Sequence, residues 1–119
     1  MKTLAGKIAV VTGASRGVGK GVALGLAAHG ATVYITGRTE KDELLPDFMK
    51  GATIHQTAEE VNGAGGIGIA HRCDFSRDED IKALFERVKS EKGRLDVLVN
   101  NAWDHQSRRL LPLRIKTGF

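Results

Sequence analysis

The stretch Val10-Val-Thr-Gly-Ala-Ser-Arg-Gly-Val-Gly19 follows the apolar run Ile8–Val11 and leads into apolar residues at helical spacing. A strand, a glycine-rich turn and the start of a helix are therefore expected in succession. Such a turn presents backbone N–H groups and the positive end of a helix dipole to an anion. Gly13 fits a tight turn, Gly17 a close approach to a phosphate, and Gly19 close packing of the helix on the strand. Because the spacing G-x-x-x-G-x-G differs from the commoner G-x-G-x-x-G, a plain strand-to-helix turn stays an alternative here.

The composition is that of one ordinary globular domain, with 119 residues of which 41% are hydrophobic and 27% charged. No apolar stretch is long enough to cross a bilayer, and the first residues lack the apolar core of a signal peptide. We therefore expect no membrane partner and an intracellular, cytoplasmic location. Cys73 is the single cysteine and has no histidine cluster near it in sequence, which predicts neither a disulfide nor a metal site.

The charge is unevenly distributed along the chain. Residues 1–104 contain 14 Lys and Arg against 14 Asp and Glu, so the net charge of +4 lies after Asp104. We therefore divide the chain into a domain at 1–104 and a basic tail at 105–119. A basic tail without interleaved aromatic residues argues against a nucleic-acid partner.

Apolar periodicity predicts alternating strands and helices. The expected strands cover 7–12, 31–36, 67–73 and 95–99, and the expected helices begin near 17, 53 and 76. Ser76-Arg-Asp-Glu79 has the pattern of a capping box, with Ser76 as N-cap and Glu79 reaching back to it. The alternation predicts an α/β fold, a doubly wound parallel sheet truncated after its fourth strand, in the order 3-2-1-4. The first and fourth strands then flank the switch point where ligands bind.

Three motifs occur in a fixed order along the chain: Thr12-Gly-Ala-Ser-Arg-Gly-Val-Gly19, Cys73-Asp74, and Leu95-Asp-Val-Leu-Val-Asn-Asn-Ala102. Together they resemble the short-chain dehydrogenases/reductases, over residues from about 4 to 104. Within that family, Ala31-Thr-Val-Tyr-Ile-Thr-Gly-Arg38 is most similar to the dehydrogenase/reductase family member 1 type. The resemblance implies a Rossmann-like fold.

The resemblance also implies that 1–104 is a half-domain that binds a nicotinamide dinucleotide. Asp74 would accept from the adenine amino group with Phe75 beside it, the alternative being an aspartate that only forms the turn before a helix. The backbone of Asn101 and Ala102 would meet the central ribose, while Asn100 braces the sheet. The pyrophosphate and the neighbouring ribose would be lined by the residues of the glycine turn, namely Gly13, Ser15, Arg16, Gly17, Val18 and Gly19.

The residues after the second expected strand indicate which dinucleotide is preferred. An NAD binder usually places Asp or Glu there to hold the ribose 2′-hydroxyl. This chain has Gly37-Arg38-Thr39 instead, and Arg38 would attract a 2′-phosphate, with Arg16 approaching from the other side. Arg38 and Thr39 are thus assigned to the cofactor site, and NADP(H) is favoured over NAD(H). A solvated loop charge at Arg38 is the alternative.

The catalytic residues of the resembling family have no counterparts in these 119 residues. That family uses a serine and a Tyr-x-x-x-Lys pair, in which the lysine lowers the pKa of the tyrosine. The single tyrosine here, Tyr34, is followed four residues later by Arg38, and its place in a strand predicts core packing. The resemblance implies an oxidoreductase acting on a carbonyl or alcohol of unspecified identity, but in a form without turnover. A non-catalytic dinucleotide-binding module and a nonfunctional fragment stay open as alternatives.

After Ala102 the sequence departs from the pattern of the short-chain dehydrogenases/reductases. Trp103 stands where most of the family has glycine, and it is expected either to pack locally or to press against the cofactor. Residues 105–119 show neither the next helix nor a fifth strand, which indicates a replaced end, as from splicing, a frameshift or a mispredicted gene model. A sheet truncated there exposes the edge of its fourth strand, so we expect marginal stability and self-association through that edge.

Overall fold

The computed structural model describes residues 3–15, 17–38 and 53–101, and the backbone of 103–104 and 109–110. Its main sheet is parallel and has the order β3-β2-β1-β4, which confirms the predicted order. The elements are β1 (Ile8–Val11), α1 (Gly17–Ala28), β2 (Thr32–Gly37), α2 (Ile54–Gly63), β3 (Ile67–Arg72), α3 (Asp78–Lys92), β4 (Val97–Val99), β5 (Trp103–Asp104) and β6 (Arg109–Leu110).

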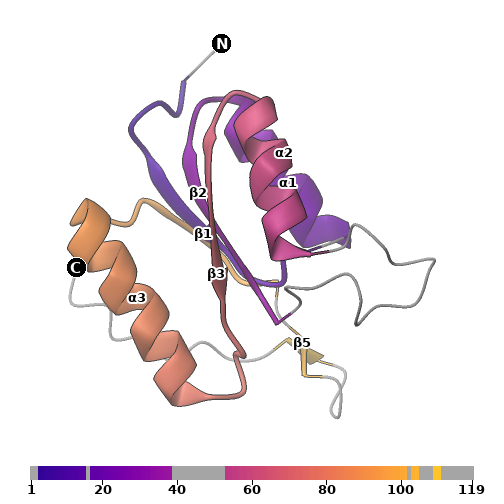
Figure 1. Ribbon diagram of the computed structural model, residues 1–119, viewed down its shortest axis with the longest axis vertical. Helices are drawn as coiled ribbons and strands as arrows, with labels where there is room; N and C mark the ends of the chain where they lie inside the picture. Colours follow the sequence, from indigo (N-terminus) through magenta and orange to yellow (C-terminus); the bar gives the residue numbers. More distant parts are fainter. Residues whose placement is uncertain (1–2, 16, 39–52, 102, 105–108, 111–119) are drawn as a thin grey trace.

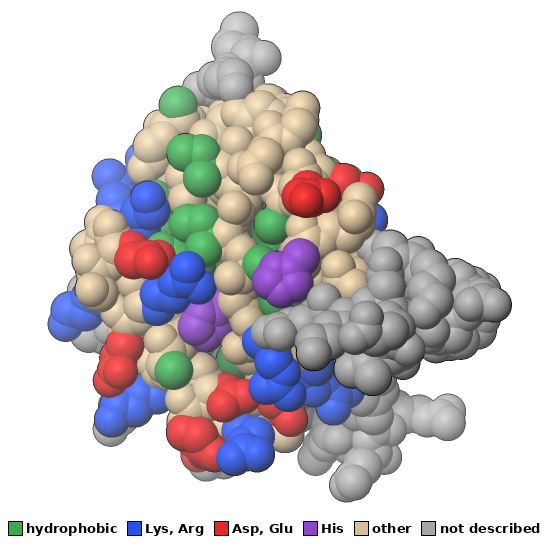
Figure 2. Space-filling model, in the orientation of Figure 1, with side chains coloured by type: hydrophobic (Ala, Val, Ile, Leu, Met, Phe, Trp, Pro, Cys, Tyr) green, Lys and Arg blue, Asp and Glu red, His purple; other side chains and the backbone are tan. Residues whose placement is uncertain are grey.

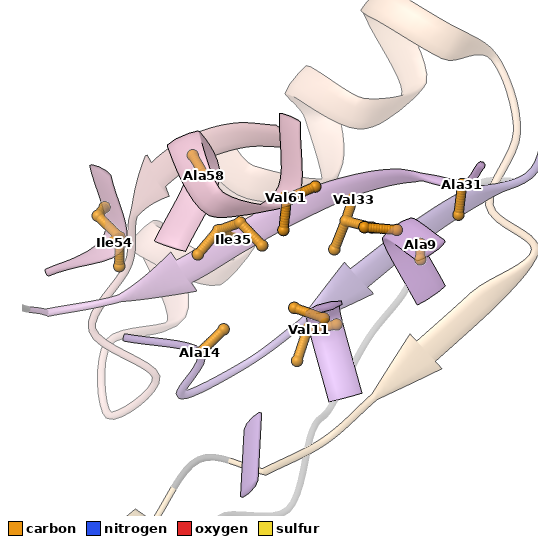
Figure 3. Packing of buried hydrophobic residues seen from close by; sticks show 11 residues of the cluster. Ala9, Val11, Ala14, Ala31, Val33, Ile35, Ile54, Ala58 and Val61 are labelled. Atoms are coloured by element: carbon orange, nitrogen blue, oxygen red, sulfur yellow. The ribbon is translucent and has the colours of Figure 1, made fainter. Parts of the chain in front are cut away.

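Helices cover both faces of the sheet, with α1 and α2 on one side and α3 on the other (Figure 1). Strand residues alternate between the two faces, so each strand supplies both cores. Val11, Val33 and Ile35 pack with α1 and α2 (Figure 3), whereas Val10 and Tyr34 pack with α3. The apolar faces of the helices are buried in these cores, from α2 Ile54, Ala58 and Val61, and from α3 Ile81, Leu84, Phe85 and Val88.

The helix α2 lies directly on the backbone of β3. A Cβ atom at Gly68 would overlap the carbonyl oxygen of Ala58 and come within 2.9 Å of the Ala58 Cα atom. Thr53 is the N-cap of α2, because its side chain accepts from the N–H of Gln56 at 3.1 Å. The helix and the strand therefore touch backbone to backbone at the start of β3.

The outer edge of β3 carries two side-chain hydrogen bonds. The Ile67 N–H donates to Ala31 O, so the N–H and C=O groups of Gly68 and Ala70 point away from β2. Asn62 Oδ1 accepts from the Gly68 N–H at 2.8 Å, and Arg87 Nη1 donates to Ala70 O at 3.2 Å. Around the ends of β3 and α3, basic and acidic side chains lie side by side on the surface (Figure 2).

The predicted capping box at the start of α3 is wrong. The helix begins at Asp78, its N-cap is Arg77, and no side chain caps it. The Ser76 hydroxyl donates to Asp74 Oδ1 at 2.7 Å, while Glu79 accepts from the Arg77 side chain. An ionised carboxylate two residues earlier is a stronger acceptor, so the serine acts as a donor and cannot cap the helix.

The strand β4 is shorter than the strand expected at 95–99. It is three residues long and pairs with β1 alone in the described sheet, and Leu98 is 39% exposed. An antiparallel pair of short strands, β5 and β6, follows β4, and the sequence did not predict it. The pair joins residues before the predicted boundary at position 104 to residues after it. The side chains of β5 and β6, and the rest of the tail, lie outside the described residues.

Candidate functional site

The glycine turn between β1 and α1 has the backbone that the sequence predicts. Gly13 and Gly17 have φ angles of +62° and +63°, a region that side chains with a Cβ rarely adopt. Gly19 is buried, and a Cβ there would overlap the carbonyl oxygen of Gly13 and come within 2.8 Å of Asn101 Nδ2. The turn is therefore closed by backbone-to-backbone contact, and it contacts the end of β4.

The start of α1 faces outward from this turn. Gly17 is exposed, Val18 is 73% exposed, and the first turn of the helix contains no acidic residue. The first N–H groups of a helix have no partner within it and lie at the positive end of its dipole. No carboxylate of the helix competes there with an anionic ligand, so the chemistry of this end fits a phosphate.

Thr12 connects the ends of β1 and β4 and is a site residue that our sequence reasoning missed. It is fully buried; its N–H donates to Val99 O at 3.0 Å, and its Oγ1 accepts from the Asn101 N–H at 2.7 Å. Its hydroxyl also lies 3.4 Å from Asn100 Oδ1, which agrees with a bracing role for Asn100. The signal lay in the predicted strand order, because pairing of the first and fourth strands brings Thr12, which opens the glycine motif, next to the two asparagines.

The end of β2 lies against the glycine turn on one side and the end of β3 on the other. Ala14 N–H donates to Thr36 O at 3.0 Å, and Cys73 N–H donates to Gly37 O at 3.0 Å. The carbonyl of Ser15 lies 3.4 Å from Thr57 Oγ1 in α2. Arg38 comes next and is exposed. The carboxyl ends of the parallel strands therefore form one continuous rim.

The loop after β3 brings Asp74 to this rim. Hydrogen bonds from the Ser76 hydroxyl and N–H, together with the positive charges of Arg38 and Arg72, hold the pKa of Asp74 below its ordinary value of 3.8. The carboxylate is thus an ionised acceptor at neutral pH. Phe75, which was assigned beside it, is 7% exposed and packs with the core on the α3 side.

Two buried titratable groups near the sheet are held in their neutral forms. Burial, reinforced by the charges of Asp80 and Asp74, raises the pKa of the Cys73 thiol to about 12. Burial and a 2.6 Å hydrogen bond to Glu91 raise the pKa of Tyr34 above its ordinary range. Tyr34 is fully buried on the α3 face, which confirms the prediction of core packing.

The structure places the predicted site residues in two groups along the rim. Gly13, Gly19 and Asn101 are in mutual proximity at the ends of β1 and β4, and Arg38 lies near Asp74 at the ends of β2 and β3. Backbone hydrogen bonds from the Ala14 N–H to Thr36 O and from the Cys73 N–H to Gly37 O connect the elements that carry the two groups. Arg16, Thr39 and Ala102, also assigned to the cofactor, lie outside the described residues, as does the side chain of Trp103.

Within the described ranges, no helix has the length and apolar character that crossing a membrane requires. The same residues contain no group of three or more His, Cys, Asp or Glu side chains arranged to hold a metal ion.

Known proteins with similar sequences are dehydrogenases and reductases. The chain is 48% identical over 99 residues to "Dehydrogenase/reductase SDR family member 1" of Mus musculus, an alignment that covers 82% of this chain and 28% of the relative. It is 43% identical over 96 residues to a "3beta-hydroxysteroid dehydrogenase" of Mediterraneibacter gnavus, covering 81% of this chain and 31% of the relative. The chain therefore spans less than a third of the length of these curated relatives.

A solved structure shows the same fold with a bound dinucleotide. A metagenomic short-chain oxidoreductase in complex with NADP superimposes with a TM-score of 0.71 at 40% sequence identity, over 85% of this chain and 41% of that one. A family model described as short chain dehydrogenase matches residues 7–111. All the described strands lie within that match. The chain belongs to the short-chain dehydrogenase/reductase family.

Proposed function

We propose that this chain binds NADP(H) along the carboxyl rim of its sheet, as the cofactor-binding part of an oxidoreductase that acts on a carbonyl or alcohol. The observation that carries the proposal is the start of α1, which is exposed, follows a turn with positive φ angles at Gly13 and Gly17, and has no acidic residue in its first turn. Exposed backbone N–H groups at the positive end of a helix dipole fit an anionic phosphate. When bound, NADPH would supply a hydride to a carbonyl, and NADP⁺ would accept one from an alcohol.

The chain's own residues have distinct parts in this proposal. Gly13, Gly17 and the start of α1 offer N–H groups to the pyrophosphate, together with Ser15, Arg16 and Val18 of the same turn. Asp74 accepts from the adenine amino group, and the backbone of Asn101 and Ala102 meets the central ribose. Thr12 holds Asn101 in place through the 2.7 Å hydrogen bond to its N–H.

Preference for NADP(H) over NAD(H) rests on Arg38. It is exposed at the end of β2, with Arg72 placed opposite Gly37 on β3, and no described residue of β2 carries a carboxylate. Positive charge there attracts a 2′-phosphate, whereas a carboxylate would repel it. Thr39 follows Arg38 and is assigned to the same phosphate. The NADP complex of the metagenomic relative supports the proposal for this chain.

We also propose that this chain binds the cofactor but does not catalyse hydride transfer. Tyr34 is the single tyrosine of the chain, and its hydroxyl donates to Glu91 on the α3 side of the sheet. A tyrosine committed to that contact cannot serve as the acid/base of the family. A non-catalytic binding module is therefore the second candidate, and a nonfunctional fragment is the outcome if no dinucleotide binds.

The test is the affinity of the purified chain for NADPH and NADH, measured by nucleotide fluorescence or calorimetry. Wild-type chain is expected to bind NADPH more tightly, and Arg38→Gln is expected to lower that preference about tenfold, which corresponds to about 1.4 kcal/mol. Lys89→Gln removes the same charge from exposed α3 and should leave the preference unchanged. Binding of neither dinucleotide, or hydride transfer by the chain alone, would contradict the respective part of the proposal.

The exposed side of β4 supports a further partner, a second copy of the chain. Leu98 is 39% exposed on a strand that pairs with β1 alone in the described sheet. An open strand edge is a template for another strand. Sedimentation equilibrium should show association that weakens in Leu98→Lys, since an edge lysine disfavours strand pairing. A monomer at all concentrations would refute this part.

A further inference from the structure

The loop between β3 and α3 holds the carboxylate of Asp74 through two hydrogen bonds. Ser76 donates to Asp74 Oδ1 twice, from its N–H at 3.0 Å and from its hydroxyl at 2.7 Å. In the described part of the chain, both hydrogen bonds that this carboxylate accepts end on Oδ1. Oδ2 is therefore the oxygen that stays available to a ligand at the rim.

The main chain of the same loop is held by separate contacts. The Asp74 N–H donates to Asp80 Oδ2 at 3.0 Å, and the Arg77 N–H donates to Asp74 O at 2.9 Å. Cys73 is tied to β2 through its N–H and the carbonyl of Gly37. None of these contacts uses the Ser76 hydroxyl. Removing that hydroxyl should therefore leave the carboxylate with one donor instead of two, while the loop keeps its path.

The terminal torsion angle of an aspartate, χ2, has a broad distribution, because rotation about an sp³–sp² bond has no steep staggered wells. Two donors on one oxygen, one from a backbone N–H and one from a hydroxyl, restrict this rotation. Both donors come from one residue two positions along the chain, so the restraint is local and survives small movements of α3.

We propose that Ser76 is a positioning residue for base recognition: it fixes Asp74 so that Oδ2 alone accepts from the 6-amino group of adenine. This inference rests on the proposed binding of NADP(H). Its consequence is selectivity between purines. A hypoxanthine ring carries a carbonyl oxygen at the same position, and an oxygen facing Oδ2 is repelled, because neither atom can donate.

The experiment measures two affinities of the full 119-residue chain, for NADPH and for its hypoxanthine counterpart, reduced nicotinamide hypoxanthine dinucleotide phosphate. Wild-type chain should favour the adenine form. In Ser76→Ala the ratio of the two dissociation constants should fall about three- to tenfold, as expected for loss of one hydrogen bond. Ser76→Thr keeps the hydroxyl and should restore the ratio.

A purely structural role for Ser76 would lower both affinities together and leave the ratio unchanged, and that result overturns the inference. Ser90→Ala, an exposed serine of α3, is the matched control and should change neither affinity. If wild-type chain binds neither dinucleotide, the proposed function fails and the inference fails with it. If wild-type chain binds both equally well, the proposed function stands and only the role of Ser76 and Asp74 in base selection is overturned.

Discussion

Adding a single methyl group at Gly19 should have the opposite effect to adding it at Gly21, two residues along the same helix. Alanine is favoured over glycine within a helix by about 1 kcal/mol, and both variants gain this term. At Gly21 a Cβ meets no atom within 4 Å, whereas at Gly19 it overlaps the Gly13 carbonyl oxygen and lies 2.8 Å from Asn101 Nδ2. Because the first obstacle is backbone, the overlap should cost about 1–3 kcal/mol.

Gly19→Ala is therefore expected to be about 1–3 kcal/mol less stable than Gly21→Ala, which itself should be slightly more stable than wild-type chain. Urea unfolding followed by circular dichroism measures both free energies, and an unchanged slope shows that the two variants unfold from comparable states. Gly19→Ala should also bind NADPH more weakly. Equal stability of the two alanine variants would refute the claim that the turn is closed by backbone contact.

Three further changes test other contacts. Thr12→Val removes the acceptor of the Asn101 N–H and should lower the free energy of unfolding by about 1–3 kcal/mol in urea titrations; unchanged stability would show that this hydrogen bond is not needed. Gly68→Ala places a methyl group against the backbone of α2 and should lower the melting temperature, by a loss of about 1–3 kcal/mol. A hydrogen bond from Arg94 and a second one from a backbone N–H of β1 hold the pKa of Asp96 below its ordinary value of 3.8. The ionised Asp96 therefore stabilises the fold above pH 3.8, and this contribution is lost as the pH falls through the lower pKa of the folded state. Asp96→Asn should therefore be less stable near neutral pH and lose less stability on acidification, and parallel acid profiles would contradict this.

Much of the fold could be predicted because its signals are local and repeated. In α3, the apolar residues Ile81, Leu84, Phe85 and Val88 recur at helical spacing, and all four are buried. The strand order followed from short connections and right-handed crossovers. The capping box failed because two local patterns overlap: the hydroxyl of Ser76 can serve a helix N–H or the carboxylate of Asp74, and charge decides between them.

The site was predictable where backbone geometry dictates residue type. A positive φ angle requires glycine at position 13, and a close approach to backbone requires it at position 19. The spacing of the glycines in the sequence therefore reveals both positions. Thr12 was missed because its partner, Asn101, lies 89 positions away in sequence, and only the parallel pairing of β1 with β4 brings the two together. Roles that depend on a distant partner require the topology as well as the motif.

The two ends of the sheet are not equivalent. Asn62 and Arg87 occupy outward-facing backbone groups of β3, while β4 pairs on one side only in the described sheet. At β3 a further strand would have to compete with these two side chains for the backbone groups of Gly68 and Ala70. The proposed pairing of two copies through β4 should therefore favour a closed dimer with two-fold symmetry, and loss of Asn62 and Arg87 should favour growth into longer assemblies.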